Sequence, residues 1–241
     1  MEKRLDVGGT LSEVIGIYRD QAGVLLPVAF WLFLIVAIVD GLTEGNLSLF
    51  WLGIVVSLAV GTLYQGMVVR LVQDIQDGRR DSSVGDLMRS VLPVLGPLLG
   101  AGILAGLGIG AGFVLLVVPG LILLTIWAVI APAIVVERLG VFDAFGRSRQ
   151  LVKGYGWPVF WTVVIAYLIT IVAAFAFTAI AGSIADGVLL RIVFSALAST
   201  VTAPIAALVA SVLYFRLLDI KGAPAPAGPA SVPQQPGDGL G

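Results

Sequence analysis

The sequence contains no cysteine and no histidine, and charged residues fill only 12% of its 241 positions. The missing cysteine excludes disulfides and thiol nucleophiles, and the missing histidine excludes imidazole acid–base catalysis. Without either residue we expect no cofactor and no Cys/His metal site. Hydrophobic residues reach 59%, against about 45–50% in soluble domains, and this excess indicates an integral membrane protein. The net charge of −1 gives no basic field, so we expect no nucleic-acid partner.

Charge-free windows of membrane-spanning length divide the chain. A helix needs about 20 apolar residues to cross roughly 30 Å of hydrocarbon. The longest window, residues 90–136, holds 47 residues without a charge, so we expect two spans there, with a turn at Val118-Pro119-Gly120. The predicted fold class is an all-α integral membrane protein with six transmembrane helices over residues 22–39, 47–69, 92–115, 120–136, 158–181 and 192–215.

The placement of lysine and arginine predicts the orientation. Arg191 lies on one side of the predicted spans, and the other 13 of the 14 positive charges lie on the opposite side. The positive-inside rule then places both termini in the cytoplasm and the protein in the cytoplasmic (inner) membrane. The first apolar run has full span length and no cleavage pattern, so we do not expect a removed signal peptide. Residues 1–220 form the predicted membrane domain, and the Pro/Gly/Ala-rich residues 221–241 a disordered cytoplasmic tail.

A short pattern precedes the first, third and fifth spans. Thr10–Glu13, Ser83–Asp86 and Gly140–Asp143 each place an acid three positions after a cap-type residue. Thr10 and Ser83 are therefore expected to cap helices in a capping-box arrangement. Apolar residues follow at helical spacing, although Ser148 interrupts the third stripe. We interpret the fold as three transmembrane hairpins, each preceded by a cytoplasmic interfacial amphipathic helix. A true repeat and convergent boundary chemistry at membrane entry both explain the pattern.

Charges return together after the long apolar window. We expect Asp143 to cap a surface helix, and Glu137 to pair with Arg138 or with an arginine further along. The basic side chains would lie near lipid phosphates, or would bind a cytoplasmic or membrane protein partner. The candidate docking or lipid-headgroup residues are Glu137, Asp143, Arg147, Arg149 and Lys153.

The third predicted span is rich in glycine. Pairs of glycines four residues apart remove side chains from one helix face and so predict close packing against another backbone. Pro97 and the dense glycines also predict that this helix is the least regular of the six. The candidate packing residues are Gly96, Gly100, Gly102, Gly106, Gly108 and Gly112.

Residues 131–160 carry three recognisable features: a Pro132 to Glu137 exit from a span, an Asp143-Ala144 to Ser148 helix, and a Leu151 to Trp157 re-entry. In these features the chain resembles the membrane-domain family attached to some glycerophosphoryl diester phosphodiesterases, which also occurs as stand-alone six-span bacterial membrane proteins. Arg149 departs from the pattern, which has an aromatic residue there. The resemblance implies little about activity, since the family's chemistry lies in a separate soluble domain that depends on histidine.

No charged residue lies centrally in a predicted span, which argues against a proton pump or an ion channel. We therefore expect a non-enzymatic scaffold, lipid-interacting protein or accessory subunit, with membrane lipids as partners. The alternative is a transporter or permease-like component for lipids or other amphiphiles, with a cavity lined by Tyr64, Gln65 and the Ser/Thr residues of the sixth span. A continuous polar path would favour this alternative, and a dry interior would oppose it. A membrane enzyme using a divalent ion at Asp74, Asp77, Asp81 and Asp86 is the least supported.

Overall fold

The computed structural model describes residues 5–43, 46–78, 83–184 and 187–222, and these residues form helices without a strand. Six helical stretches are long and apolar enough to cross a membrane: Ala22–Thr43, Leu49–Gln76, Val84–Leu115, Val117–Glu137, Gly156–Gly182 and Val188–Lys221. The predicted all-helical architecture with six apolar spans is confirmed at this level. Nearly all of the predicted tail lies outside the described residues. The elements are α1 (Val7–Asp20), α2 (Ala22–Thr43), α3 (Leu47–Gln76), α4 (Val84–Val91), η1 (Leu92–Val94), α5 (Leu95–Leu115), α6 (Val117–Ile126), α7 (Ile130–Glu137), α8 (Val141–Val152), α9 (Gly156–Ile184) and α10 (Val188–Lys221).

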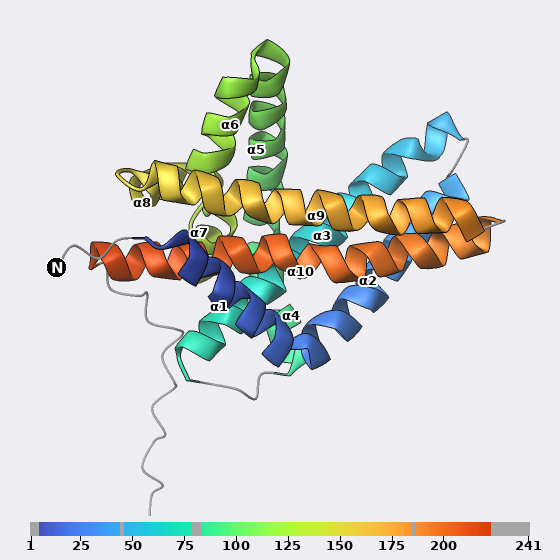
Figure 1. The fold of residues 1–241 in the computed structure, drawn as a ribbon, viewed down its shortest axis with the longest axis horizontal. Coiled ribbons are helices and arrows are strands. Elements are labelled where there is room, and N and C mark those ends of the chain that lie inside the picture. The colour runs from blue at the N-terminus through green and yellow to red at the C-terminus, as the bar shows by residue number, and fades with distance from the viewer. Residues whose placement is uncertain (1–4, 44–45, 79–82, 185–186, 223–241) are drawn as a thin grey trace, which may run out of the picture.

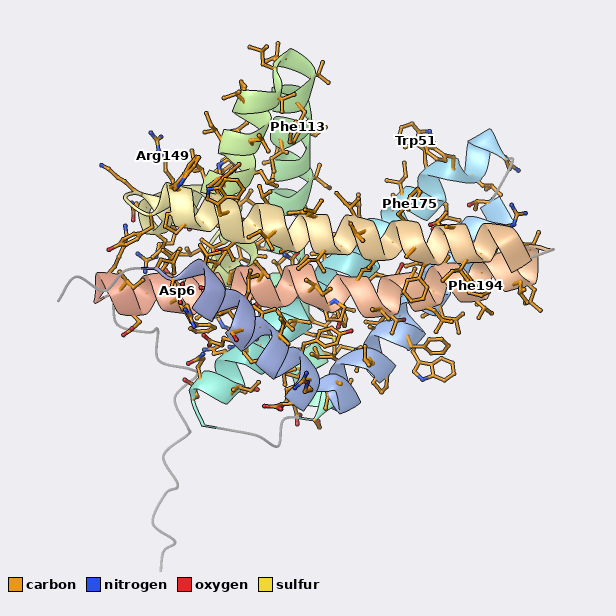
Figure 2. All side chains as sticks on the ribbon, in the orientation of Figure 1. Asp6, Trp51, Phe113, Arg149, Phe175 and Phe194 are labelled. Carbon is orange, nitrogen blue, oxygen red and sulfur yellow. The ribbon has the colours of Figure 1, made fainter. Side chains whose placement is uncertain are left out.

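The longest helix, α10, is the centre of the packing. It packs along α2 and α9 and also contacts α3. Helices α5 and α6 pack mainly on each other, and in Figure 1 this pair stands at a steep angle to α9 and α10. The short helices α1 and α8 contact α10, and α4 contacts α3. Figure 2 shows Asp6 and Arg149 at one end of the long helices and Trp51 and Phe175 toward the other.

Local capping explains where two of the short helices begin. Ser83 caps α4, since its Oγ accepts a hydrogen bond from the Asp86 amide at 3.2 Å and donates to the Asp86 carboxylate at 2.7 Å. The prediction for Ser83 is therefore confirmed, but the one for Thr10 is wrong. Helix α1 begins earlier because the Asp6 carboxylate accepts from the amides of Gly8 and Gly9 at 3.1 and 2.9 Å. Thr10 lies inside the helix and donates to the Asp6 carbonyl at 2.7 Å.

The boundary between the third and fourth spans differs from the prediction. The chain reverses at Leu116, whose backbone is extended at φ −163° and ψ 147°. The expected turn at residues 118–120 lies instead in the first turn of α6, where a proline is tolerated because the first amides of a helix need no intrahelical partner. The glycine-rich α5 is continuous from Leu95 to Leu115. The glycine-rich part of the third span is therefore a continuous helix, after the short 3-10 turn η1 at its start.

The fourth span is broken in its middle. Helix α6 ends at Ile126 and α7 begins at Ile130. Pro132 accounts for the break, because it has no N–H for the Ala128 carbonyl and its ring crowds the preceding turn. The Ile130 amide bonds the Trp127 carbonyl at 3.3 Å, and this shorter-range contact leaves the Ile126 carbonyl without its usual partner in the helix.

Ser148 supplies the missing hydrogen bond. Its hydroxyl, on α8, donates to the Ile126 carbonyl at 2.7 Å, and the Ser148 side chain is fully buried. An unpaired backbone carbonyl in hydrocarbon costs several kcal/mol, since no water is present to bond it. The residue that interrupts the apolar stripe of α8 therefore joins this short helix to the broken span.

Replacing Ser148 with alanine should destabilise the protein by about 1–2 kcal/mol, because the Ile126 carbonyl then loses its donor. The matched control is Ser90→Ala, which removes a hydroxyl that bonds Leu87 within its own short helix at 2.7 Å. Reversible unfolding by titration with sodium dodecyl sulfate in mixed micelles measures both effects. Equal losses for the two variants would show that the break does not depend on α8.

Candidate functional site

A partly buried ion pair lies where α7, α8 and α10 meet. The Arg147 Nε donates to both carboxylate oxygens of Glu137, at 2.8 and 2.9 Å. The Tyr214 hydroxyl donates to the same carboxylate at 2.6 Å, and the Tyr214 side chain is fully buried. The side chains of Glu137 and Arg147 are 15% and 26% exposed, so water screens this pair incompletely. Charge-assisted bonds of this kind are stronger than neutral ones.

A residue in the left-handed backbone conformation lies between Glu137 and the helix that carries Arg147. Arg138 ends α7 with φ 54° and ψ 40°, a conformation that few non-glycine residues adopt. The chain then turns into α8, whose N-cap is Gly140 without a side-chain hydrogen bond. Asp143 lies in the first turn of α8, where its charge faces the positive end of the helix dipole. Its predicted position at the helix start agrees with the structure, although it is not the cap itself.

The predicted docking cluster is divided by the structure. Glu137 and Arg147 bond each other inside the protein, whereas Asp143, Arg149 and Lys153 are exposed. Ala144, Ser148 and Leu151 form the buried face of α8. Figure 2 shows Arg149 projecting away from α8.

The last turns of α10 hold two further short helices. Arg216 donates from Nε to the Glu13 carboxylate at 2.7 Å and from Nη2 to the Gly9 carbonyl at 2.9 Å, which fixes α1. The Lys221 ammonium donates to the Lys153 carbonyl at 3.0 Å and to the Gln150 carbonyl, at the end of α8. No local sequence pattern indicates these roles, because each partner lies at least 68 residues away along the chain.

Tyr18 ties the other end of α1 to α10. Its hydroxyl donates to the Val201 carbonyl at 3.2 Å. Burial raises the pKa of Tyr18 above its ordinary value of 10.0, so the hydroxyl stays protonated as a donor at neutral pH.

A cavity of about 310 Å³ lies among residues of α3, α5, α6, α7, α9 and α10. Its size is at the lower end of the roughly 300–1,000 Å³ that ligand pockets occupy. Its lining is mostly aliphatic and includes Trp127, at the break between α6 and α7. The polar side chains in the lining are Thr62, Gln65 and Tyr167, and no charged residue is among the lining residues.

The six candidate packing glycines of α5 have different surroundings. Gly102 and Gly106 line the cavity. A Cβ atom added to Gly108 would lie 2.7 Å from the Trp127 ring, and one added to Gly112 would lie 2.9 Å from the backbone of Gly120. These two positions adjoin α6. A Cβ at Gly100 would lie 3.2 Å from Val141, and one at Gly96 would meet no atom within 4 Å.

The residues that line the cavity agree only in part with those expected for a transporter. Gln65 lines it, but Tyr64 is buried elsewhere and donates to the Leu25 carbonyl at 3.3 Å. The hydroxyl groups expected from the sixth span are also absent from the lining. Thr202 and Ser211 instead bond carbonyls of their own helix at 2.8 and 2.7 Å.

A second cavity, of about 410 Å³, lies beside α1, α3 and α10. Its polar and charged lining residues are Glu13, Gln76, Arg216 and Asp219. The Glu13–Arg216 ion pair that fixes α1 therefore forms part of its wall. Within the described part of the chain, no group of three or more acidic residues is placed to hold a metal ion. Asp81, from the alternative metal site, lies outside the described residues.

Part of the chain is similar to a known bacterial membrane protein. The chain is 38% identical over 103 residues to a UPF0259 membrane protein of Pectobacterium carotovorum subsp. carotovorum (strain PC1). The matched part covers 42% of this chain and 40% of the length of that relative. No family model and no solved structure matches the sequence.

Six long apolar helices and this similarity define the class of the protein. It is a bacterial multi-pass integral membrane protein. The resemblance to the membrane domains of glycerophosphoryl diester phosphodiesterases stays a prediction, since no family model matches.

Removing one member of the Glu137–Arg147–Tyr214 group should leave the others poorly paired. We expect Arg147→Met to lower the free energy of unfolding by about 1–3 kcal/mol, since the Glu137 carboxylate loses its charged partner. The double variant Glu137→Gln/Arg147→Met should lose less than the sum of the two single losses, which a double-mutant cycle in mixed micelles measures. The exposed Arg149→Met is the control. Strict additivity would contradict an energetic link between the pair.

Proposed function

We propose that this protein is a non-enzymatic lipid-interacting protein of the cytoplasmic membrane. The observation that carries the proposal is the cavity of about 310 Å³, which is lined mainly by apolar residues of the spanning helices. Because the lining belongs to the apolar helices, the cavity would lie at membrane depth, where lipid chains would be its natural occupants.

The architecture that we propose follows the charge distribution. The helices α1, α4 and α8 would lie on the cytoplasmic face, each ahead of a transmembrane hairpin, with both termini in the cytoplasm. The strong bias of positive charge to one side of the spans supports this orientation. The exposed Arg149 and Lys153 would then face anionic headgroups, with about 1 kcal/mol of attraction for each charge near the surface.

Holding a lipid suits the cavity better than passing a polar solute. Transport of polar molecules needs a polar path, whereas three polar side chains stand in this lining among aliphatic ones. The permease-like alternative for amphiphiles rests on a different observation, the break at residues 127–129, because discontinuous spans often line the substrate sites of transporters. Trp127, in that break, lines the cavity.

The orientation can be tested by single-cysteine labelling, since the chain has no cysteine of its own. Arg149→Cys places a thiol on the exposed face of α8, and Leu189→Cys places one at the 75% exposed start of α10. We expect a membrane-impermeant maleimide to label Cys at position 189 in spheroplasts and at position 149 only in inverted vesicles. The reverse pattern would contradict cytoplasmic termini.

Filling the cavity should displace its lipid. Gly106 lines the cavity and Gly110 does not, and a Cβ atom at either position would meet no atom within 4 Å. We expect Gly106→Leu to reduce lipid retained through purification by roughly tenfold, equivalent to about two displaced methylenes at ~0.8 kcal/mol each. The matched control Gly110→Leu should retain lipid as the unmodified protein does. Native mass spectrometry counts the retained lipids, and equal retention in both variants would refute the proposal.

A further inference from the structure

The three polar side chains that line the cavity share one property. Thr62, Gln65 and Tyr167 make no hydrogen bond to any described residue, although the cavity lies among apolar helices. Thr62 and Gln65 are three residues apart on α3 and therefore lie on one face of that helix, and Tyr167 belongs to α9.

Thr62 differs in this respect from the other threonines of the described residues. Each of the others donates its hydroxyl to the backbone carbonyl four residues earlier, as Thr170 does to Ala166 at 2.9 Å. Such a bond is the usual way for a threonine to satisfy its hydroxyl inside a helix. The Thr62 hydroxyl forms none, so it is available to a molecule in the cavity.

Gln65 strengthens the same point. A primary amide carries two N–H donors and an acceptor oxygen, and leaving such a group unbonded in an apolar medium costs roughly 2–7 kcal/mol. An occupant with an oxygen atom would bond the amide and remove that cost. A pure hydrocarbon would fill the space but leave the Thr62 hydroxyl and the Gln65 amide unbonded.

The cavity also discriminates against charge. With no charged side chain in the lining, a carboxylate, phosphate or ammonium group inside it would have no counter-ion. We therefore infer that the cavity binds one apolar lipid chain that carries an uncharged oxygen function, a hydroxyl or an ester, at Thr62 and Gln65. This inference rests on the proposed function and adds the chemical class of the ligand.

The position of the polar pair fits this kind of ligand. Gln65 precedes Arg70 by five residues, a rise of about 7.5 Å along α3. The oxygen function would thus lie just inside the charged end of the bundle, at the depth where lipid ester and hydroxyl groups meet the hydrocarbon. The chain of the lipid would lie beside Gly102 and Gly106, where α5 has no side chains to fill the space.

Trp127 provides the measurement, because its ring lines the cavity. The full-length chain with Trp31, Trp51, Trp157 and Trp161 replaced by phenylalanine keeps a single indole at that site. Bromine quenches indole fluorescence on contact. Titrating this protein in nanodiscs with dibrominated stearyl alcohol, methyl dibromostearate or dibrominated octadecane compares three probes that share one chain length and differ in the oxygen function.

The proposal expects saturable quenching by the alcohol and the ester at about 3–10-fold lower probe content than by the hydrocarbon, the value of one hydrogen bond. Gln65→Leu should remove that preference, so that the three probes quench at the same probe content. Thr62→Val, which is nearly isosteric, is the second variant and should reduce the preference without altering the fold. Thr170→Val, whose hydroxyl bonds its own helix outside the cavity, is the matched control and should change nothing.

The two levels of the proposal fail in different ways. Equal saturable quenching by all three probes, unchanged in Gln65→Leu and Thr62→Val, would overturn the inference about the oxygen function and leave lipid binding intact. Quenching that rises in proportion to each probe without saturation would overturn the proposed function itself, since no discrete site would then exist.

Discussion

The absence of water inside the bilayer is the constraint on which this structure depends. Every backbone carbonyl at that depth needs a donor from the protein, and a straight helix provides one for each. Pro132 removes that provision in the fourth span and splits it into α6 and α7. Ser148, from outside the span, bonds the Ile126 carbonyl that the break leaves without its partner in the helix. The short helix α8 is therefore joined to the broken span by the Ser148 hydroxyl, in addition to the Arg147–Glu137 ion pair.

The last turns of α10 hold the short helices α1, α7 and α8 by side-chain hydrogen bonds. Tyr214 bonds the carboxylate that ends α7, Arg216 bonds α1, and Lys221 bonds the end of α8. Each bond joins a short helix to α10, the longest helix of the described residues. Since α10 also packs along α2 and α9, it connects these two long helices with α1, α7 and α8. The α5–α6 pair stands at a steep angle to α9 and α10 (Figure 1), and residues of both helices of the pair line the cavity.

The glycines of α5 serve two purposes that their spacing alone does not separate. Gly108 and Gly112 adjoin α6, where larger residues would collide with Trp127 or with backbone. Gly102 and Gly106 leave space that no neighbour fills, and that space is part of the cavity. A glycine has no side chain, so it permits either close packing against a neighbouring helix or an unfilled space. The residues that face the glycine from the neighbouring helices decide between these two outcomes.

The sequence by itself determined the helical class, the six apolar spans and the Ser83 cap, because hydropathy and capping act over a few neighbouring residues. It also indicated that Glu137 would pair with an arginine. Only the tertiary structure decided that the partner is Arg147, that Tyr214 joins them, and that Thr62 and Gln65 face a cavity while Tyr64 does not. These outcomes depend on how helices distant in the chain rotate and cross. Packing across the whole bundle sets that geometry, and no local sequence pattern encodes it.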